Sequence, residues 1–216
     1  MAYNTQEEFS KKRNGALINE SIYYLNKSKS KWVSVGLSVE RKYDPIIKLG
    51  GCKNNQNVIF NEDQWISFLN NQGIMLSFIY SNGFGWQPMQ GKGFEIHFVF
   101  INESRIIKIT QGDANEVFLA GDTINELVSL TNLIKYRFDM LKSQEFSIYY
   151  NIIFSGISIR NGDLLKNVYD VISPLTNTNS VNVCCVLELL NFYPECIIED
   201  VETFACNEFI KACIEK

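Results

Sequence analysis

One pattern of residues occurs twice in the 216-residue chain, with the two copies about 60 residues apart. The first copy begins with the apolar run 46–49, followed by a polar turn, a second apolar run at 58–60 and a stretch of helix-like spacing. The second copy repeats this order from the runs 106–109 and 117–120. Short apolar runs bounded by turn residues are typical of strands, and longer periodic runs of helices. Each copy therefore predicts strand, turn, strand, helix.

The two copies also correspond residue by residue. Ile46, Ile47, Lys48, Asp63, Trp65 and Phe68 of the first copy match Ile106, Ile107, Lys108, Asp122, Ile124 and Leu127 of the second. Two similar units in one chain can pack as a pseudo-dimer, in which each unit buries what the other leaves exposed. Chance similarity among short apolar strings is the alternative interpretation.

The first of these helices has a recognisable start. Asn61 is a favourable N-cap residue, and Glu62 and Asp63 follow it in the first turn, where the helix dipole favours acidic side chains. The polar stretch 70–73 is expected to interrupt this helix before it ends near Ile79.

A strand is predicted from Trp32 to Arg41, because apolar and other residues alternate there. Val33, Val35, Leu37 and Val39 would face the core, and Trp32 would face outward together with Ser34, Gly36, Ser38 and Glu40. An outward tryptophan either stacks on a ligand or covers another element of the protein.

These patterns together predict an α+β fold. Two tandem units of antiparallel sheet plus helix are expected to form a pseudo-dimer, and further helices are expected towards the carboxy terminus. The predicted organisation is a polar and basic segment at 1–30 with a short helix through 16–25, a duplicated strand-rich core at 31–142 (units 31–80 and 94–141), and a helical region at 143–216.

Charge is spread unevenly along the chain. Residues 1–53 carry ten Lys or Arg against five acidic residues, whereas residues 163–216 carry three against nine. A basic amino-terminal segment of this kind is typical of a protein surface that binds a polyanion. No apolar run reaches the ~18 residues needed to span a membrane, and the charged amino terminus is not that of a signal peptide. No membrane partner is therefore expected, and the expected location is intracellular, nuclear or viral, in a virion or at a replication site.

No catalytic or metal site is predicted. The chain has no Ser, His and Asp in a triad order and no nucleotide-binding motif, and its one histidine, His97, has no cysteine near it. The cysteines, at 52, 184, 185, 196, 206 and 213, form no Cys-x-x-Cys pair, so they are expected to be reduced and, in the tail, buried. The expectation is a non-enzymatic protein without a cofactor.

The strand-to-helix junction Val58–Trp65 resembles that of the carboxy-terminal domain of the transcriptional positive cofactor 4 family. The tandem repeat is similar to the plant Whirly proteins, which place two such units in one chain, although their Lys-Gly-Lys-Ala-Ala-Leu signature is absent here. The resemblance covers residues 31–142 and implies binding of single-stranded DNA over curved antiparallel sheets. Abundant Asn and Ile suggest an AT-rich coding source, such as a DNA virus or mobile element.

Single-stranded DNA or RNA is therefore the expected partner of a protein that would act in replication, transcription or genome protection as a homo-oligomer. The predicted interface consists of Lys29, Lys31, Trp32, Arg41, Lys42, Tyr43, Lys48, Lys53, Arg105 and Lys108. A glycine-rich loop adds two aromatic residues, Phe84 and Trp86, which either stack on bases or pin the loop to the core. The alternative function is that of a viral structural or self-assembling protein, for example a matrix or occlusion component.

Overall fold

A computed structural model describes residues 15–53, 56–83, 85–158, 162–175 and 180–203. They belong to two compact units. The first, called the strand-rich unit here, consists of Glu20–Ser38 and Pro45–Met140. The second, called the helical unit, contains the described residues of Met1–Asn19, Val39–Asp44 and Leu141–Lys216.

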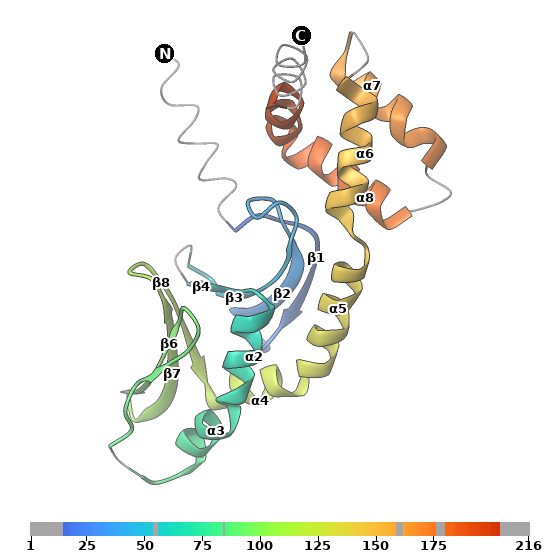
Figure 1. Ribbon diagram of the computed structural model, residues 1–216. Coiled ribbons are helices and arrows are strands. Elements are labelled where there is room, and N and C mark those ends of the chain that lie inside the picture. Colours follow the sequence, from blue (N-terminus) through green and yellow to red (C-terminus); the bar gives the residue numbers. More distant parts are fainter. Residues whose placement is uncertain (1–14, 54–55, 84, 159–161, 176–179, 204–216) are drawn as a thin grey trace. The chain divides into compact units, whose positions relative to one another are not determined.

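Two four-stranded antiparallel sheets contain all the strands of the described residues (Figure 1). Sheet A has the order β1 (Leu17–Tyr24), β2 (Lys31–Ser38), β3 (Pro45–Gly51), β4 (Asn57–Phe60). Sheet B has the order β5 (Met89–Gln90), β6 (Glu95–Ile101), β7 (Ser104–Gln111), β8 (Asn115–Ala120). The prediction of an α+β fold with two antiparallel sheets is thus confirmed.

Four helices follow the two sheets in the strand-rich part of the chain: α2 (Glu62–Asn70), α3 (Gln72–Tyr80), α4 (Gly121–Ser129) and α5 (Thr131–Ser143). The predicted start of the first helix is confirmed, because the Asn61 side chain accepts a hydrogen bond from the Gln64 backbone and Gln64 returns one to the Asn61 backbone. The predicted interruption is confirmed too, since α2 ends and α3 begins at Asn71.

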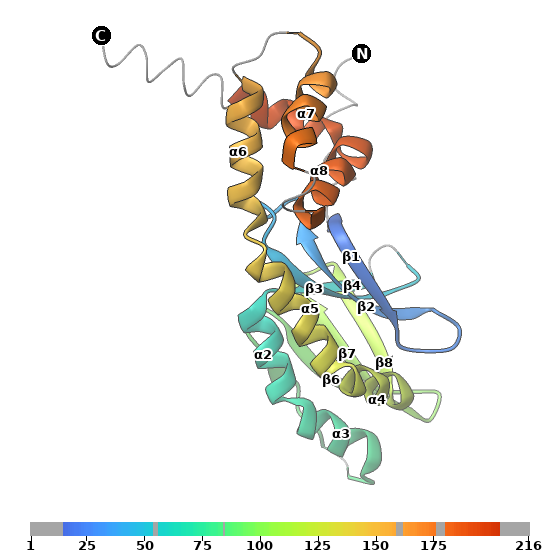
Figure 2. The ribbon, with the colours of Figure 1, turned by 90° about the vertical axis from the view of Figure 1, so that its right-hand side faces the viewer.

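The core of the strand-rich unit lies between one face of each sheet and these helices (Figure 2). The buried side chains on these faces include Val33, Val35, Leu37, Ile47, Leu49, Val58 and Phe60 in sheet A, and Ile96, Ile107, Ile109, Val117 and Leu119 in sheet B. The helices contribute Trp65, Phe68, Met75, Phe78, Ile124, Leu127, Ile134 and Phe138. Burial of this apolar face is the main term that stabilises the unit, at roughly 25 cal/mol per Å² removed from water.

The two sheets also contact each other directly. Strand β4, at the edge of sheet A, lies against β7 and β8 of sheet B. The side-chain amide of Gln111 forms two hydrogen bonds with the main chain of Ile59, which ties the end of β7 to β4.

Three details of the amino-terminal third differ from the predictions. The prediction of a helix through 16–25 is wrong, because Leu17–Tyr24 forms strand β1, which pairs with β2. The exposure of its side chains alternates with the period of two that is typical of a strand. The predicted strand to Arg41 ends at Ser38, and the following turn contains two residues with positive φ. The expected outward face of that strand is also wrong in part, since Ser34 and Ser38 are buried.

The helical unit contains α6 (Phe146–Ser158), α7 (Leu164–Ile172), a short 3₁₀ turn η1 (Ser173–Leu175), α8 (Ser180–Phe192) and a further helix, Pro194–Thr203. The helices between 146 and 203 agree with the helical region predicted at 143–216, and its part at 204–216 lies outside the described residues. Asp163 caps α7 by accepting a hydrogen bond from the backbone N–H of Lys166 at 2.9 Å. The buried residues of this unit include Phe146, Tyr150, Ile153, Phe154, Ile157, Val168, Val183, Val186, Leu189 and Ile197.

Within the described residues, no single helix has the length and apolar character needed to span a membrane. One bent pair of helices, Val181–Phe192 and Pro194–Thr203, meets both requirements when taken together, with a bend of 101° between them.

Candidate nucleic-acid interface

Trp32 lies on the face of sheet A opposite the helices, where it covers a glycine. Its pairing partner across β2 and β3 is Gly50, and a Cβ atom at Gly50 would overlap the indole ring. Lys48, two residues before Gly50 on β3, places its ammonium group 5.7 Å from the ring centroid of Trp32. This distance is within reach of a cation–π contact. The missing side chain at Gly50 therefore lets the indole lie against the sheet beside a lysine.

These residues line a cavity of about 180 Å³, called the Trp32 cavity here. Its lining consists of Trp32, Lys48, Gly51, Cys52, Lys53, Gln56 and Asn57. Lys31 lies at its border, since Lys31 pairs with Gly51 and its Nζ donates to Oε1 of Gln56 at 3.1 Å. Three ammonium groups, one indole and two side-chain amides thus meet at one end of sheet A.

Burial changes the acid–base behaviour of two of these lysines. Removal from water lowers the pKa of Lys48, with attraction from Glu20 acting in the opposite direction. Removal from water also lowers the pKa of Lys31, opposed by the nearby Cys52. In both cases the desolvation of the ammonium group is the larger effect. A bound anion would restore part of the lost solvation of these charges.

Four other predicted residues lie outside this cavity. Lys29 is exposed in the turn between β1 and β2, with its ammonium group 5.1 Å from the ring centroid of Tyr24. Arg41, Lys42 and Tyr43 belong to the helical unit. There Tyr43 is buried in edge contact with aromatic rings of α6, so its ring is a core element of that unit.

The two predicted cations of sheet B are held by the protein's own groups. Arg105 donates to the carbonyl oxygens of Phe78 and Gly83 at 2.7 and 3.1 Å. Lys108 forms an ion pair with Glu116 at 2.8 Å and lies 5.5 Å from the ring centroid of Phe118. Both of these cations of sheet B are thus engaged by groups of the strand-rich unit.

Of the two aromatic residues predicted in the glycine-rich loop, Trp86 lies within the described residues. Trp86 packs against the rings of Phe78 and Phe98, and its indole N–H donates to the carbonyl of Gly83 at 3.2 Å. Its contacts are those of a residue that pins the loop to the core. Phe84 lies outside the described residues.

Sequence reasoning missed several residues of the cavity, namely Gly50, Gly51, Cys52, Gln56 and Asn57. The Gly50-Gly51 pair in an otherwise apolar strand was the available signal, because a glycine inside a strand often marks the close approach of another group. Gln56 and Asn57 carried no such signal, since their role depends on the path of the turn before β4.

The described cysteines are thiols with different surroundings. Cys185 and Cys196 are buried, as predicted for the tail, but Cys184 is exposed because it lies on the outer side of α8. Cys52 is exposed at the Trp32 cavity, whereas Cys206 and Cys213 lie outside the described residues. Across the part of the chain that the structure describes, no three His, Cys, Asp or Glu side chains are grouped as metal ligands would be.

Comparisons with protein-family models, with curated proteins and with solved structures find no match for this chain.

Proposed function

We propose that the strand-rich unit binds single-stranded nucleic acid at the Trp32 cavity. The observation that carries this proposal is the half-buried indole of Trp32 lying over Gly50, with the ammonium group of Lys48 beside it. Binding to single strands requires cations for the phosphates and an aromatic ring for a base, which adds roughly 1–3 kcal/mol per stacked base. The cavity supplies both.

The lysines around the cavity have distinct roles in this proposal. Lys53 is exposed at the rim and would attract the phosphate backbone, while Lys31 and Lys48 are partly desolvated and would contact it closely. The amides of Gln56 and Asn57 can donate to phosphate or base oxygens without selecting a sequence. We therefore expect the affinity to depend strongly on salt concentration and only weakly on the base sequence.

We also propose that the two sheets are the two halves of a tandem pseudo-dimer. In β3, Ile47 lies opposite Phe60 of the next strand, and in β7, Ile107 lies opposite Leu119. The residue after each isoleucine is a lysine on the other face of its sheet. The matching strand pairings of Ile47 in sheet A and Ile107 in sheet B support the proposal. A solved structure in which the two strand-and-helix units failed to superpose would contradict it.

The test of nucleic-acid binding is a fluorescence-anisotropy titration of labelled oligo-dT and of a duplex at two salt concentrations. We expect the single strand to bind more tightly, with log K falling by about 0.7 per contacted phosphate for each tenfold rise in salt. The absence of single-strand affinity at ~50 mM salt would overturn the proposal, because phosphate contacts are strongest at low salt.

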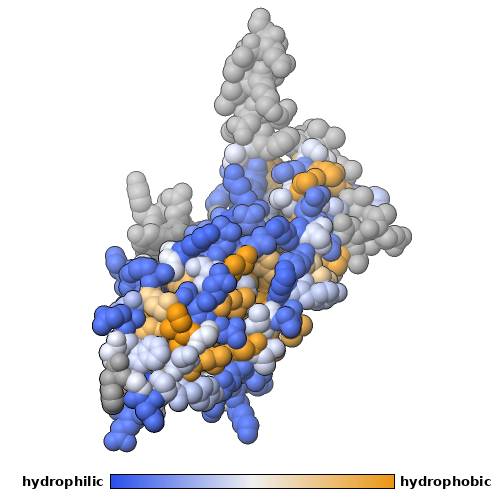
Figure 3. Space-filling view, turned by 60° about the horizontal axis from the view of Figure 1, so that its bottom comes forward, coloured by the Kyte–Doolittle hydropathy of each residue, from blue (hydrophilic) through white to orange (hydrophobic). Residues whose placement is uncertain are grey.

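Self-assembly is the second candidate function, and apolar side chains on the helices of the strand-rich unit favour it. Tyr136, Tyr80 and Ile66 are 67%, 66% and 50% exposed, and a space-filling view shows hydrophobic patches between hydrophilic side chains (Figure 3). Apolar patches of this kind are common at contacts between subunits. Sedimentation velocity over a range of concentrations tests this reading, since self-assembly requires a mass that rises with concentration.

A further inference from the structure

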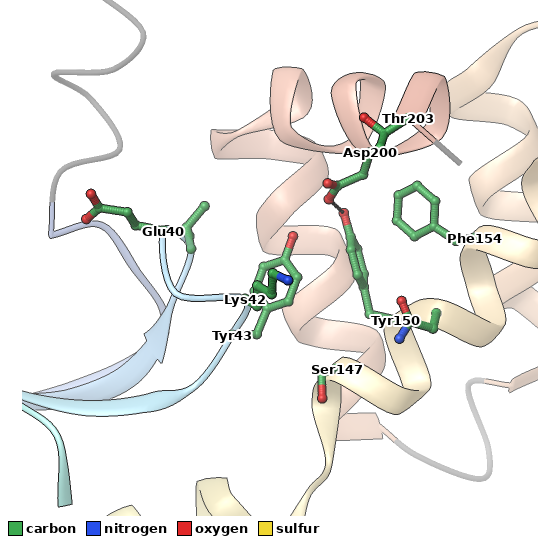
Figure 4. A pocket seen from close by; sticks show the side chains of 10 residues that line it. Glu40, Lys42, Tyr43, Ser147, Tyr150, Phe154, Asp200 and Thr203 are labelled. Carbon is green, nitrogen blue, oxygen red and sulfur yellow. Dashed lines mark hydrogen bonds between the residues drawn. The ribbon is translucent and has the colours of Figure 1, made fainter. Parts of the chain in front are cut away.

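The helical unit contains a second cavity, of about 560 Å³, called the Tyr150 cavity here (Figure 4). It lies between the turn Val39–Asp44, α6 and the helix Pro194–Thr203. Its volume is in the range of pockets that bind small ligands, which is roughly 300–1,000 Å³. The two cavities share no lining residue.

Aromatic rings form one wall of this cavity. The centroids of Tyr43 and Tyr150 are 4.7 Å apart with their planes at 68°, and those of Tyr150 and Phe154 are 4.5 Å apart at 64°. Figure 4 shows Tyr43 and Phe154 on opposite sides of the Tyr150 ring. Rings crossed at such angles present π faces as well as edges, and a π face attracts cations.

The turn that supplies Tyr43 has an unusual backbone. Lys42 and Tyr43 are consecutive left-handed residues, with φ of 51° and 66°. This conformation costs roughly 1–2 kcal/mol for each residue that is not glycine. Contact of the Tyr43 ring with Phe146 and Tyr150 offsets that cost and directs the ring towards the helices. The strain is therefore retained at the wall of a cavity, where strained residues often serve a function.

A carboxylate is held at the edge of the aromatic wall. The Tyr150 hydroxyl donates to Oδ2 of Asp200 at 3.1 Å. Burial raises the pKa of Tyr150, and Tyr43 and Asp200 raise it further, so this phenol stays protonated and remains a donor at physiological pH. The other charged residues of the lining are Glu40 and Lys42. The lining therefore includes two acidic residues and one lysine, and Figure 4 shows the Glu40 carboxylate directed away from the aromatic wall.

We propose that the Tyr150 cavity binds an organic cation, namely a primary ammonium or guanidinium group held at Asp200 with its aliphatic stem against the aromatic wall. An anion would meet the carboxylate of Asp200, and an uncharged ligand would gain neither the ion pair nor the cation–π contact. The cation can be a free amine or the side chain of a basic peptide, because both present the same group.

The experiment is isothermal titration calorimetry of the full-length protein with agmatine, which carries both groups on a four-carbon stem. We expect agmatine to bind, and 1,4-butanediol, which has the stem without the charge, to bind at least about tenfold more weakly. A capped Gly-Arg-Gly peptide forms a second arm. Tighter binding of the peptide than of agmatine assigns the cation to a protein side chain, and the reverse order assigns it to a free amine. Equal binding of agmatine and butanediol would overturn the proposal.

Variants separate this site from general attraction to an acidic surface. Asp200→Asn keeps an oxygen that accepts from Tyr150 but removes the charge, and should weaken agmatine binding by about tenfold or more. Glu199→Gln removes a carboxylate from the same helix outside the cavity lining, and should change binding less than about twofold. Equal losses in both variants would show surface attraction only and would overturn the proposal.

Two further variants keep the test decisive if Asp200→Asn does not fold. Tyr150→Phe removes the hydroxyl that positions the carboxylate and should weaken agmatine binding severalfold. Lys42→Ala removes the one ammonium group of the lining and should strengthen agmatine binding by a similar factor, because a like charge is lost. A loss of affinity in Lys42→Ala would contradict binding of a cation at this position.

Discussion

The side chain of Gln111 pairs with the main chain of Ile59 as a neighbouring strand would. Its Nε2 donates to the Ile59 carbonyl at 2.7 Å, and its Oε1 accepts from the Ile59 N–H at 2.9 Å. Ile59 lies on β4, the last strand in the order of sheet A, so its outward main-chain groups would otherwise need another partner. One amide side chain therefore satisfies a sheet edge and joins the two sheets.

Replacing this side chain should destabilise the strand-rich unit. Gln111→Ala leaves the N–H and C=O of Ile59 without the amide, at an expected cost of about 1–3 kcal/mol in the free energy of unfolding. Urea denaturation measures this cost, and amide hydrogen exchange at Ile59 should accelerate. Gln87→Ala, at an exposed loop position, is the control. Unchanged exchange at Ile59 in Gln111→Ala would show that the two hydrogen bonds carry no stability.

Helix capping predicts two substitutions that should change the free energy of unfolding in opposite directions. Asn61→Ala removes the cap of α2 and should lower the free energy of unfolding by about 0.5–2 kcal/mol. The equivalent position before α4 is Ala120, whose side chain forms no capping hydrogen bond although its φ of −79° and ψ of 169° suit an N-cap. Ala120→Asn should therefore raise the free energy of unfolding by a similar amount. Thermal midpoints that moved in the same direction for both variants would contradict this account.

How far the sequence predicts the structure depends on the range of the interaction involved. The start of α2 at Asn61 and the interruption near Asn71 were predictable, because capping depends on residues a few positions apart. Strand β1 was not, since a short mixed segment such as Leu17–Tyr24 becomes a strand through its pairing with β2. The burial of Ser34 likewise depends on what packs over its face of the sheet.

The candidate site shows the same limit. The sequence predicts Lys31, Trp32, Lys48 and Lys53 as basic and aromatic residues of one interface, and the structure brings them together at one cavity. Tyr43 belongs to the same predicted interface but is a core residue of the other unit. Composition and spacing identify basic and aromatic residues that are close along the chain. They do not show that the turn Val39–Asp44, which carries Tyr43, belongs to the helical unit.

The pKa of Lys48 predicts a stability effect that depends on pH. Because desolvation lowers this pKa in the folded state, the unfolded chain binds the proton more readily, and stability rises with pH between the lowered pKa and the ordinary value of 10.5. Lys48→Met removes the buried charge and should raise the urea midpoint at pH 7. The gain over the parent should shrink as the pH approaches 10.5. A Lys48→Met variant less stable than the parent at pH 7 would contradict the desolvation argument.

Loss of the cavity lysines should change how binding depends on salt. Lys31→Ala, Lys48→Ala and Lys53→Ala should each weaken binding of oligo-dT and reduce the slope of log K against log salt by up to about one unit per lost phosphate contact. Lys135→Ala, which breaks an exposed ion pair with Asp139, is the matched control. Slopes that stayed equal in all four variants would place the phosphate contacts elsewhere on the protein.

The indole should contribute to affinity without contributing to salt dependence. Trp32→Ala should cost roughly 1–3 kcal/mol of binding free energy with little change in the salt slope, because stacking releases no counterions. Gly50→Ala should have a smaller effect of the same kind, since the added methyl group displaces the ring. Gly73→Ala, where a Cβ meets no neighbouring atom within 4 Å, is the control. Anisotropy titrations that left Gly50→Ala and Trp32→Ala equal to the parent would exclude Trp32 as a stacking residue.

The order of strands within each sheet has a consequence for how the chain folds during synthesis. Among the described strands, each pairs only with its neighbours in sequence, so each sheet can form by successive hairpins as it leaves the ribosome, without waiting for distant segments. The Gln111–Ile59 pair spans 52 residues and can form only after sheet B exists. The helical unit combines Val39–Asp44 with Leu141–Lys216, and so it is completed last. Truncation before α6 should therefore leave the sheets folded, while the turn that carries Tyr43 loses Phe146 and Tyr150 as packing partners.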